Sequence, residues 1–511
     1  MLKNKFNRDV LKALVTICVI LGLCKVTLGV AAALVAVMGV FFALMRKPGY
    51  LAACYVMFPV FTIINRAVVG LSPVLLMTAR LGNLVMIAAM ILTGAGFSGR
   101  ARERLPIAWL FAYCVVACLS SFDGWMPFIS YMKIAQFVLF LMGLLFVTRI
   151  MQQSDKGLYQ LRCVFMAISI IFLVGSLLSR LVPSVGFSMQ LGSMANYGLE
   201  TTGEELLKGE GLVMFNGMTW HSQMLAPVVA IMAAWVLCDM LLVERRFTFL
   251  HTALLVAAPA LLYMSRSRGG LLEIASVVGT AVLVCVPRAR LARAVKSRLT
   301  QMLLLGIALL VLAAVVGQIR SQAISRWLRK TEDVRGDTRS LKDAFTGSRQ
   351  ALIEYNLNDF KLNPMFGKGF QVMRGMEQAY RVGIITWYSA AVEKGVTPYV
   401  ILGETGIFGA GIFLAFLLSF YSTCIKRRYL ALLTMFTCVL VANLADSTLF
   451  SPGGLGGFQW IAACIGGFGI DLMSIRQRLP IGMWGLPPPD VQAAPKRSRR
   501  IELPGGRIVY R

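Results

Sequence analysis

Long runs of uncharged, apolar residues recur along this chain, and they constrain its fold more than any other feature. A helix needs about 20 such residues to cross about 30 Å of hydrocarbon. About fourteen runs come close to that length, at residues 10–24, 26–45, 50–69, 71–93, 105–120, 127–149, 158–179, 219–243, 248–264, 269–287, 302–318, 397–421, 428–447 and 455–475. They predict an all-α, polytopic transmembrane helical bundle rather than a soluble domain around an apolar core.

The composition of the chain agrees with that prediction. Of its 511 residues, 57% are hydrophobic, whereas a soluble globular chain is roughly 45–50% apolar. The formal net charge of +27 raises the alternative of a nucleic-acid partner. Because no basic run is interleaved with aromatic residues on a polar face, we assign the basic residues to loops at a membrane surface and expect no nucleic-acid binding.

The basic residues alternate between connections in the way that fixes orientation in a membrane. With the N-terminus in the cytoplasm, every second connection is basic, at Arg46-Lys47, Arg100, Arg102, Arg104, Arg149, Lys156, Arg245-Arg246, the 288–298 cluster and Lys426-Arg427-Arg428. The short connections between them, 70–72, 121–126 and 448–454, have no Lys or Arg. The first run lacks a clear small-residue cleavage site, so we expect a retained anchor. This pattern predicts a multi-pass protein with both termini in the cytoplasm.

The long connections divide the chain into parts. Residues 1–318 hold the first eleven predicted spans, and 319–396 form a large outer loop. The loop has an amphipathic helical pattern around 319–330, a longer helical pattern near 337–359 and a turn at Asn363-Pro364. Residues 397–475 hold the last three spans, and 476–511 form a basic tail. A loop as long as 319–396 is usually functional. Its Lys and Arg outnumber its Asp and Glu thirteen to eight, so we expect either an anionic partner or a solvated cap.

Several familiar catalytic motifs are missing from the sequence. The chain has no phosphate-binding P-loop, because Gly367-Lys368-Gly369 is followed by Phe370, and it has no Asp-x-Asp pair for a metal-bound nucleotide. No spacing of Cys and His suits zinc. The cysteines lie in or beside apolar spans, and we interpret them as packing residues. We therefore expect no metal and no cofactor.

Basic residues within or beside apolar spans are the strongest chemical signal. A charge at a helix centre costs about 2.5–3.5 kcal/mol on insertion scales, so such residues usually face a cavity or a partner. Arg80 and Lys133 lie within spans, Arg266 and Arg268 lie at the outer junction of two spans, and Arg349 lies in the long loop. A guanidinium offers a planar fork of donors that matches phosphate oxygens. The arginines suit a lipid-linked diphosphate, although each basic side chain could instead snorkel or pair internally.

Four sequence elements occur in a recognisable order between about 210 and 460. They are Ser267-Arg268-Gly269, Gly347-Ser348-Arg349, 363–370 (NPMFGKGF) and 402–409 (LGETGIFG), and a further segment, 211–226 with Asn216 and His221, precedes the first of them. With the long outer loop, this order resembles the O-antigen ligase and polymerase superfamily of bacterial envelope glycan assembly.

The resemblance implies an integral-membrane glycosyltransferase of the C type. Such enzymes take a glycan from undecaprenyl diphosphate and pass it to an acceptor hydroxyl on the outer side of the inner membrane, without metal or nucleotide sugar. By position, Arg268 and Arg349 would bind the diphosphate and stabilise its developing charge. Arg266, Arg80 and Lys394 are further candidates for binding the substrate.

One departure from the family pattern concerns the general base. Ligases of this family typically place a histidine shortly before the Glu-x-Gly element, but residues 391–399 here contain none. Either Glu393 acts as the base, or His221 reaches the site from another helix; the alternatives are a salt-bridged Glu393 and a helix-end His221. Glu404 could orient the site or simply favour the helix dipole.

The missing histidine favours a polymerase-like enzyme that extends a surface polysaccharide or exopolysaccharide from lipid-linked repeat units. The expected partners are the bilayer, the lipid-linked donor, an acceptor glycan, a flippase and a chain-length regulator. One alternative is a ligase that joins finished glycan to lipid A-core or to protein. An alternative of another class is a transporter or flippase of lipid-linked glycans, which has little need for the long loop.

Overall fold

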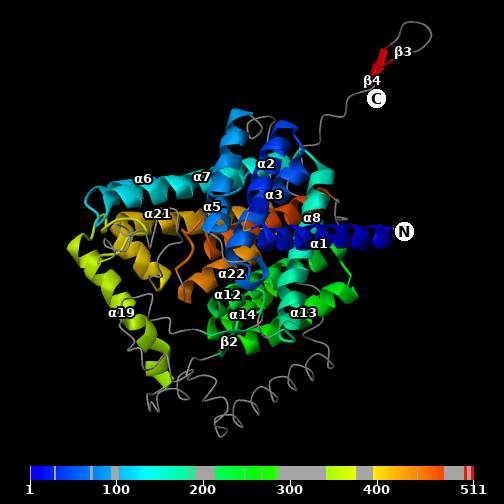
Figure 1. Ribbon diagram of the computed structural model, residues 1–511. Helices are drawn as coiled ribbons and strands as arrows, with labels where there is room; N and C mark the ends of the chain where they lie inside the picture. Colours follow the sequence, from blue (N-terminus) through cyan, green and yellow to red (C-terminus); the bar gives the residue numbers. More distant parts are fainter. Residues whose placement is uncertain are drawn as a thin grey trace, which may run out of the picture.

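The computed structural model consists mainly of α-helices (Figure 1). It describes residues 2–27, 30–69, 73–93, 103–182, 185, 187–189, 213–246, 248–265, 267–285, 341–375, 395–445, 447–476, 500–502 and 508–510. Within these ranges the strands form two short antiparallel pairs, β1 (Phe187–Met189) with β2 (Val213–Phe215) and β3 (Arg500–Glu502) with β4 (Ile508–Tyr510).

The helices follow the apolar runs of the sequence. Their bounds in the first half of the chain are α1 Leu2–Val26, α2 Val30–Leu44, α3 Pro48–Ile63, α4 Arg66–Val69, α5 Pro73–Leu92, α6 Ala108–Phe122, α7 Pro127–Met151, α8 Asp155–Ile170, the π-helical turn η1 Ile171–Gly175 and α9 Ser176–Ser179. Those in the second half are α12 Ser222–Cys238, the π-helical turn η3 Asp239–Glu244, α13 Phe249–Met264, α14 Arg268–Cys285, α19 Leu341–Leu362, α21 Thr397–Arg427, α22 Leu430–Ala445, α23 Leu455–Ile461, the π-helical turn η4 Ala462–Gly467 and α24 Phe468–Arg476.

Five continuous helical segments are long and apolar enough to cross a membrane. They are 127–151, 155–179, 223–244, 397–427 and 455–476, and seven shorter apolar helices accompany them within the described residues. Every predicted run except 302–318 lies mainly on a described helix or on consecutive ones, and 302–318 lies outside the described residues. The predicted helix near 337–359 is confirmed as α19 with slightly shifted ends. The amphipathic helix expected around 319–330 falls on residues that the structure does not describe.

Apolar side chains face outward as well as inward in this bundle. On α1, the side chains of Leu11, Val15, Val19 and Leu23 form a stripe at four-residue spacing, and each residue is about half exposed. Similar exposed aliphatic and aromatic residues lie on α2, α5, α6 and α21. In a water-soluble monomer such contiguous apolar surface is rare, whereas a bilayer covers it at no cost in hydration. The outer surface of the bundle is therefore compatible with lipid.

Three of the basic connections, around Glu103, Gln152 and Tyr429, meet at one end of the bundle. Gln152 and Glu103 exchange hydrogen bonds of 3.2 and 2.8 Å between side chain and backbone, and the Tyr429 hydroxyl donates to the Glu103 carboxylate. Arg476 donates to Asp155 and to the backbone carbonyl of Gln152. These contacts bring together connections that lie far apart in the sequence. We call this end of the bundle the basic end.

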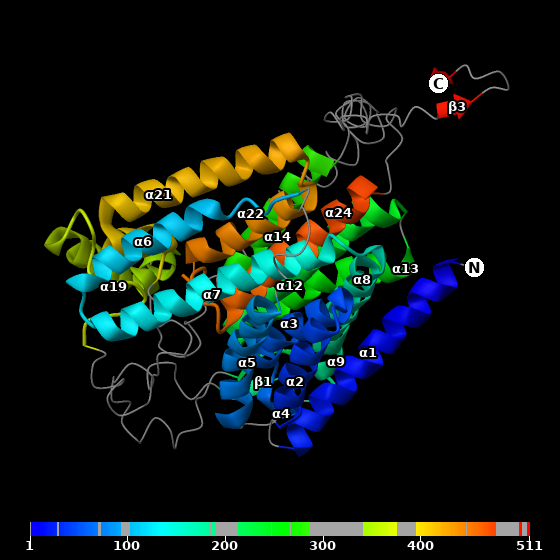
Figure 2. The ribbon, with the colours of Figure 1, turned by 90° about the horizontal axis from the view of Figure 1, so that it is seen from above.

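The opposite end carries α19 and the connections 121–126 and 448–454, which lack basic residues. The backbone N–H of Trp125 donates to the Lys368 carbonyl at 3.1 Å, and that of Ser447 donates to the Gly395 carbonyl at 2.8 Å. Figures 1 and 2 show α19 (yellow-green) next to the ends of α6 and α21 at the edge of the bundle. We call this end the α19 end.

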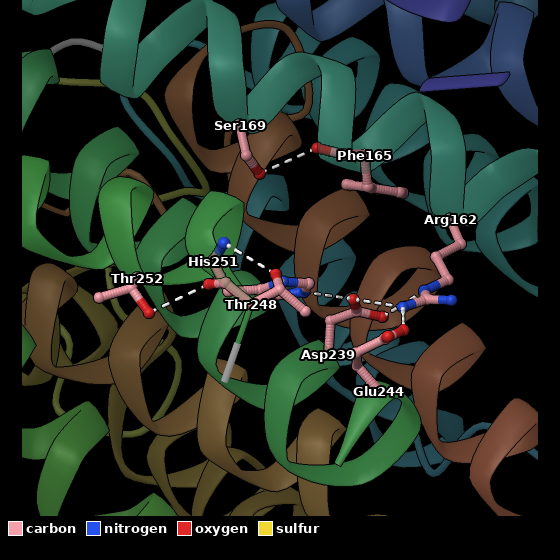
Figure 3. A network of polar contacts seen from close by, with 8 residues as sticks. All are labelled: Arg162, Phe165, Ser169, Asp239, Glu244, Thr248, His251 and Thr252. Atoms are coloured by element: carbon pink, nitrogen blue, oxygen red, sulfur yellow. Dashed lines mark hydrogen bonds and ion pairs between the residues drawn. The ribbon is translucent and has the colours of Figure 1, made fainter. Parts of the chain in front are cut away.

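A buried network of charges joins three helical segments near the basic end (Figure 3). Arg162 donates to both carboxylate oxygens of Asp239, at 2.7 and 2.9 Å, and to Glu244 at 3.0 Å. The His251 Nε2 lies 2.9 Å from Asp239, and its Nδ1 lies 2.6 Å from the Thr248 hydroxyl. Because Arg162 lies on α8, Asp239 on η3 and His251 on α13, the network fixes these segments against one another.

Asp239→Asn should destabilise the bundle strongly, because it removes the fully buried carboxylate of the network and leaves Arg162 with only the partly exposed Glu244 as a paired charge. Breaking a buried ion pair from one side costs about 3–5 kcal/mol. Unfolding of the purified protein in detergent, monitored by circular dichroism, measures the loss. The matched control is Asp155→Asn, which removes an exposed partner of Arg476 and should change stability by about 1 kcal/mol or less. Equal effects of the two changes would contradict the importance of the network.

Candidate functional site

The two sequence elements 363–370 and 402–409 lie directly against each other at the α19 end. The backbone N–H groups of Lys368 and Gly369 donate to the carbonyls of Gly403 and Glu404, at 2.9 and 3.2 Å. In the other direction, the N–H of Ile407 donates to the Pro364 carbonyl at 2.9 Å. The long loop therefore docks onto α21 through its backbone, between segments about forty residues apart in the sequence.

Two glycines make this close approach possible. Gly367 has φ +75°, and a Cβ atom there would lie 2.4 Å from the backbone carbon of Glu404. Gly406 has φ +63° and ψ −161°, which breaks the regular helix inside α21, and a Cβ atom there would lie 2.4 Å from the backbone carbon of Met365. Glycine reaches positive φ without steric cost. Because α21 is broken at Gly406, its backbone can bond to the loop.

Glu404 and Gln371 fix the next part of the loop. The backbone N–H of Gln371 donates to the Glu404 Oε1 at 2.9 Å, and the Gln371 side chain donates to the carbonyl of Phe450. Both residues are buried. Gln371 has φ +54°, a conformation that costs a residue with a Cβ atom roughly 1–2 kcal/mol. The two hydrogen bonds hold the loop in this conformation, so Glu404 positions the loop.

Serines of α6 and α7 complete the cradle around the loop. The Ser130 hydroxyl accepts from the Phe370 N–H at 2.8 Å and is 2.9 Å from the Phe370 carbonyl. The Ser120 hydroxyl accepts from the Gly369 N–H at 3.1 Å and donates to the Glu404 carbonyl. All of these groups are buried. The N–H groups of Gly369, Phe370 and Gln371 are thus each satisfied by a side chain from another helix, as buried backbone donors require.

Beneath the loop lies a floor of packed aromatic rings. The rings of Tyr113 and Phe450 stack with centroids 4.9 Å apart, and Phe370 meets Tyr113, Phe137 and Phe450 with centroids 5.8 to 6.3 Å apart. Such ring pairs prefer stacked or edge-to-face geometry and add to the stability from area burial. The floor belongs to the core of the bundle and supports the loop from one side. The loop can therefore present fixed groups toward the other side.

His221 occupies a helix end in the structure. It is the N-cap residue of α12, and its Nδ1 accepts a hydrogen bond from the Gln223 N–H at 3.1 Å. Two alternative roles for His221 follow from the sequence, a general base in the site or a residue at a helix end, and the structure shows the helix-end position. The neighbouring Trp220 bonds through its N–H to the Ile63 carbonyl, which ties this cap to α3.

The structure describes the predicted arginines only through their backbone. Arg80 lies within α5, Arg268 is the first residue of α14, and Arg349 lies in the first half of α19. Their side chains are outside the described part of the structure. Arg266, Glu393 and Lys394 also lie outside the described residues. The roles assigned to these residues remain predictions.

Lys133 has one of the largest fully buried side chains in the described bundle. It lies on α7 one helical turn after Ser130, whose hydroxyl holds Phe370, and one turn before Phe137, whose ring meets Phe370. Residues at these spacings share one face of a helix. Lys133 is therefore buried on the face of α7 that supports the docked loop. This placement argues against simple snorkelling to the membrane surface.

The polar side chains that hold the loop could not be recognised in the sequence. Ser120, Ser130 and Gln371 were not singled out, because single serines and glutamines in a sequence carry no local signal. The described part of the chain contains no cluster of three His, Cys, Asp or Glu that could hold a metal ion. The groups that the structure places around the loop are hydrogen-bonding backbone and polar side-chain groups.

Gly367→Ala should separate the loop from α21, because the added methyl group meets backbone rather than a side chain that can move. We expect a loss of about 1–3 kcal/mol in stability, together with faster proteolytic cleavage between 363 and 375. The control is Gly411→Ala in α21, where a Cβ atom meets nothing within 4 Å. This change should stabilise the protein by about 0.5–1 kcal/mol. Unfolding in detergent and limited proteolysis measure both variants. Unchanged cleavage in Gly367→Ala would argue against the docking.

Compared with models of known protein families, the chain matches none, and it matches no curated protein. Its candidate site therefore rests on the geometry described above and on the sequence elements that the geometry joins.

Proposed function

We propose that this protein is a polymerase-like membrane glycosyltransferase. It transfers glycan repeat units from undecaprenyl diphosphate to an acceptor glycan hydroxyl on the outer side of the bacterial inner membrane, and so builds a surface polysaccharide or exopolysaccharide. The observation that carries the proposal is the docking of 363–371 onto the broken helix α21, which joins two of the resembling elements into one rigid platform. A platform held by buried polar groups suits a site that must keep its geometry.

The proposed arrangement in the membrane has about fourteen spans, with both termini in the cytoplasm and the α19 end outside. Two observations support it. The basic connections around 103, 152–155 and 429 lie beside one another at the opposite end, as the positive-inside rule expects of cytoplasmic loops. Exposed apolar side chains cover the helices between the two ends. A lipid-linked donor would then reach the platform with its tail in the bilayer.

In the proposed reaction, the oxygen of an acceptor hydroxyl attacks the anomeric carbon of the donor. A new glycosidic bond forms while the bond to the diphosphate oxygen breaks, and the electron pair leaves with that oxygen. Arg268 and Arg349 stabilise the charge that develops on the diphosphate, with Arg266, Arg80 and Lys394 as further binding groups. One displacement inverts the configuration at the anomeric carbon.

The proton of the acceptor hydroxyl needs a base within about 2.6–3.2 Å. Glu393 is the favoured base, because His221 already uses its Nδ1 to cap α12. Glu404 contributes indirectly, because its carboxylate accepts the hydrogen bond from the Gln371 N–H and so holds the loop in place. This division leaves Glu404 as a positioning residue rather than as the base.

The two alternative functions differ in their products. A ligase would transfer a finished glycan once, to lipid A-core or to protein, and would give capped core without longer chains. A transporter would move lipid-linked glycan across the bilayer without forming a glycosidic bond. The platform favours a transferase over a transporter, because a translocation path needs no rigid site at the outer end of the bundle.

Reconstitution in vesicles with lipid-linked repeat units should yield glycans of increasing length, because each product can serve as the next acceptor. Gel electrophoresis of the released glycans measures the length distribution, and empty vesicles are the control. Glycans that stay at one repeat while the units cross the bilayer would contradict the proposal and support a transporter. One addition to lipid A-core and no further growth would support a ligase.

Arg268→Lys should lower the polymerisation rate about tenfold to a hundredfold although the charge is kept, because an ammonium cannot donate the forked pair of hydrogen bonds. The rate of donor consumption in the same vesicles measures the effect. Arg427→Lys, at the basic end of α21, is the control and should retain the wild-type rate. A near-normal rate in Arg268→Lys would speak against the diphosphate contact.

A further inference from the structure

Trp125 is held in one orientation at the α19 end. It lies in the short turn between α6 and α7 and is only partly buried. Its indole Nε1 donates to the Asp359 Oδ1 of α19 at 3.2 Å, and its backbone N–H donates to the Lys368 carbonyl at 3.1 Å. A partly exposed tryptophan fixed at its edge and at its backbone presents a defined aromatic surface.

Two cationic side chains from the docked loop converge on that ring. The Arg374 guanidinium carbon lies 5.1 Å from the ring centroid, and the Lys368 Nζ lies 5.9 Å from it. Lys368 also pairs with Asp123 at 2.9 Å, and the Asp123 side chain is 75% exposed. The loop that docks on α21 therefore also carries charge to the face of Trp125.

Arg374 is the exposed member of this group. Its backbone N–H donates to the Tyr355 hydroxyl at 2.5 Å, which fixes the start of the side chain near α19. Among the described residues no carboxylate forms an ion pair with its guanidinium. An exposed guanidinium over an aromatic ring gains only about 0.5–1 kcal/mol from that contact, so it can turn toward an incoming anion at little cost.

Packing alone does not account for this arrangement. A tryptophan that served only to fasten α19 to the α6–α7 turn would be expected to bury its ring among apolar side chains. Here the ring is bordered by Lys368, Arg374 and Asp359. Fixed aromatic surface next to hydrogen-bonding side chains of both charges is suited to a sugar, whose pyranose ring has an apolar C–H face and a polar rim.

We propose that Trp125, Arg374 and Lys368 form a subsite for an acidic saccharide residue of the glycan. The indole takes the C–H face of the pyranose, and the Arg374 guanidinium pairs with the sugar carboxylate, which it can grip with two parallel hydrogen bonds. Lys368 and Asp123 bind neighbouring hydroxyls. The choice of a glycan as the occupant rests on the proposed function, and the excess of basic residues in 319–396 supports its negative charge.

Binding of short acidic oligosaccharides to the purified full-length protein in neutral detergent tests the proposal. The probes are oligogalacturonide, oligoglucuronide and oligosialic acid, each compared with its carboxyl-reduced form, so that only the charge differs. Isothermal titration should show at least one acidic probe binding about tenfold or more tightly than its reduced form, as one charge-assisted hydrogen bond predicts. The proposal is wrong if none of the three binds or if each binds as weakly as its reduced form.

Two variants assign the binding to this subsite. Trp125→Ala should weaken binding of the acidic probe about tenfold or more, and Arg374→Gln should abolish the preference for the acidic over the reduced probe. The controls are Trp109→Ala, which removes an exposed tryptophan near the opposite end of α6, and Lys361→Gln, which removes an exposed charge on α19. Both controls should bind as the wild type does. Trp125→Ala removes a partly buried ring and so also tests folding, whereas Arg374→Gln changes an exposed side chain and is the decisive variant. If Arg374→Gln keeps the wild-type preference for the acidic over the reduced probe, the proposal is wrong.

Competition with sodium pyrophosphate separates a sugar from a phosphate group. Pyrophosphate carries charge without a sugar ring, so it should displace the acidic probe poorly, and efficient displacement would overturn the assignment to a saccharide. These measurements need neither donor nor turnover. If the wild-type protein binds acidic probes but does not extend lipid-linked units, only the polymerase function is contradicted. If it polymerises but shows no charge-dependent binding, only the subsite is contradicted.

Discussion

The backbone pairing between 363–371 and the broken helix α21 is the interaction on which the α19 end depends. It uses peptide groups on both sides, and it requires Gly367 and Gly406 because side chains at those positions would collide with the opposite backbone. Once the loop is seated, Glu404 and the serines of α6 and α7 can bond to it. The position of Trp125 follows as well, since its N–H bonds to the carbonyl of Lys368 in the seated loop.

The two ends of the bundle handle polar groups in different ways. Near the basic end, the charges of Arg162 and Asp239 pair deep inside the helices, and His251 contacts the same carboxylate. An unpaired charge would be very costly there. At the α19 end, hydroxyl and amide groups are buried around the loop together with Glu404 and Lys133. Lys368, Arg374 and Asp123 lie nearer the surface, and Arg374 and Asp123 are exposed. The first arrangement locks helices together, and the second leaves charge accessible to a ligand.

The sequence was a good guide to the helices and a poor guide to the contacts between them. Apolar runs identify spans because the length of a helix in lipid is set by the thickness of the bilayer, and α19 could be predicted from local pattern and its following Asn-Pro turn. The two glycine-rich elements could be recognised separately. Their mutual contact could not be predicted, because it depends on the tertiary path of the long loop. Arg162 and Asp239 offered a usable signal that was missed, since each is a charged residue inside an apolar run, as Arg80 is.

The break at Gly406 also bears on how this protein can change over evolutionary time. A helix interrupted near lipid exposes amide and carbonyl groups that hydrocarbon cannot solvate, and here the peptide groups of the loop take the place of the missing helical partners. Loop and helix are therefore complementary halves of one hydrogen-bonded unit. A shortened loop would leave α21 with unsatisfied polar groups, so insertions and deletions should be confined to stretches away from 363–371.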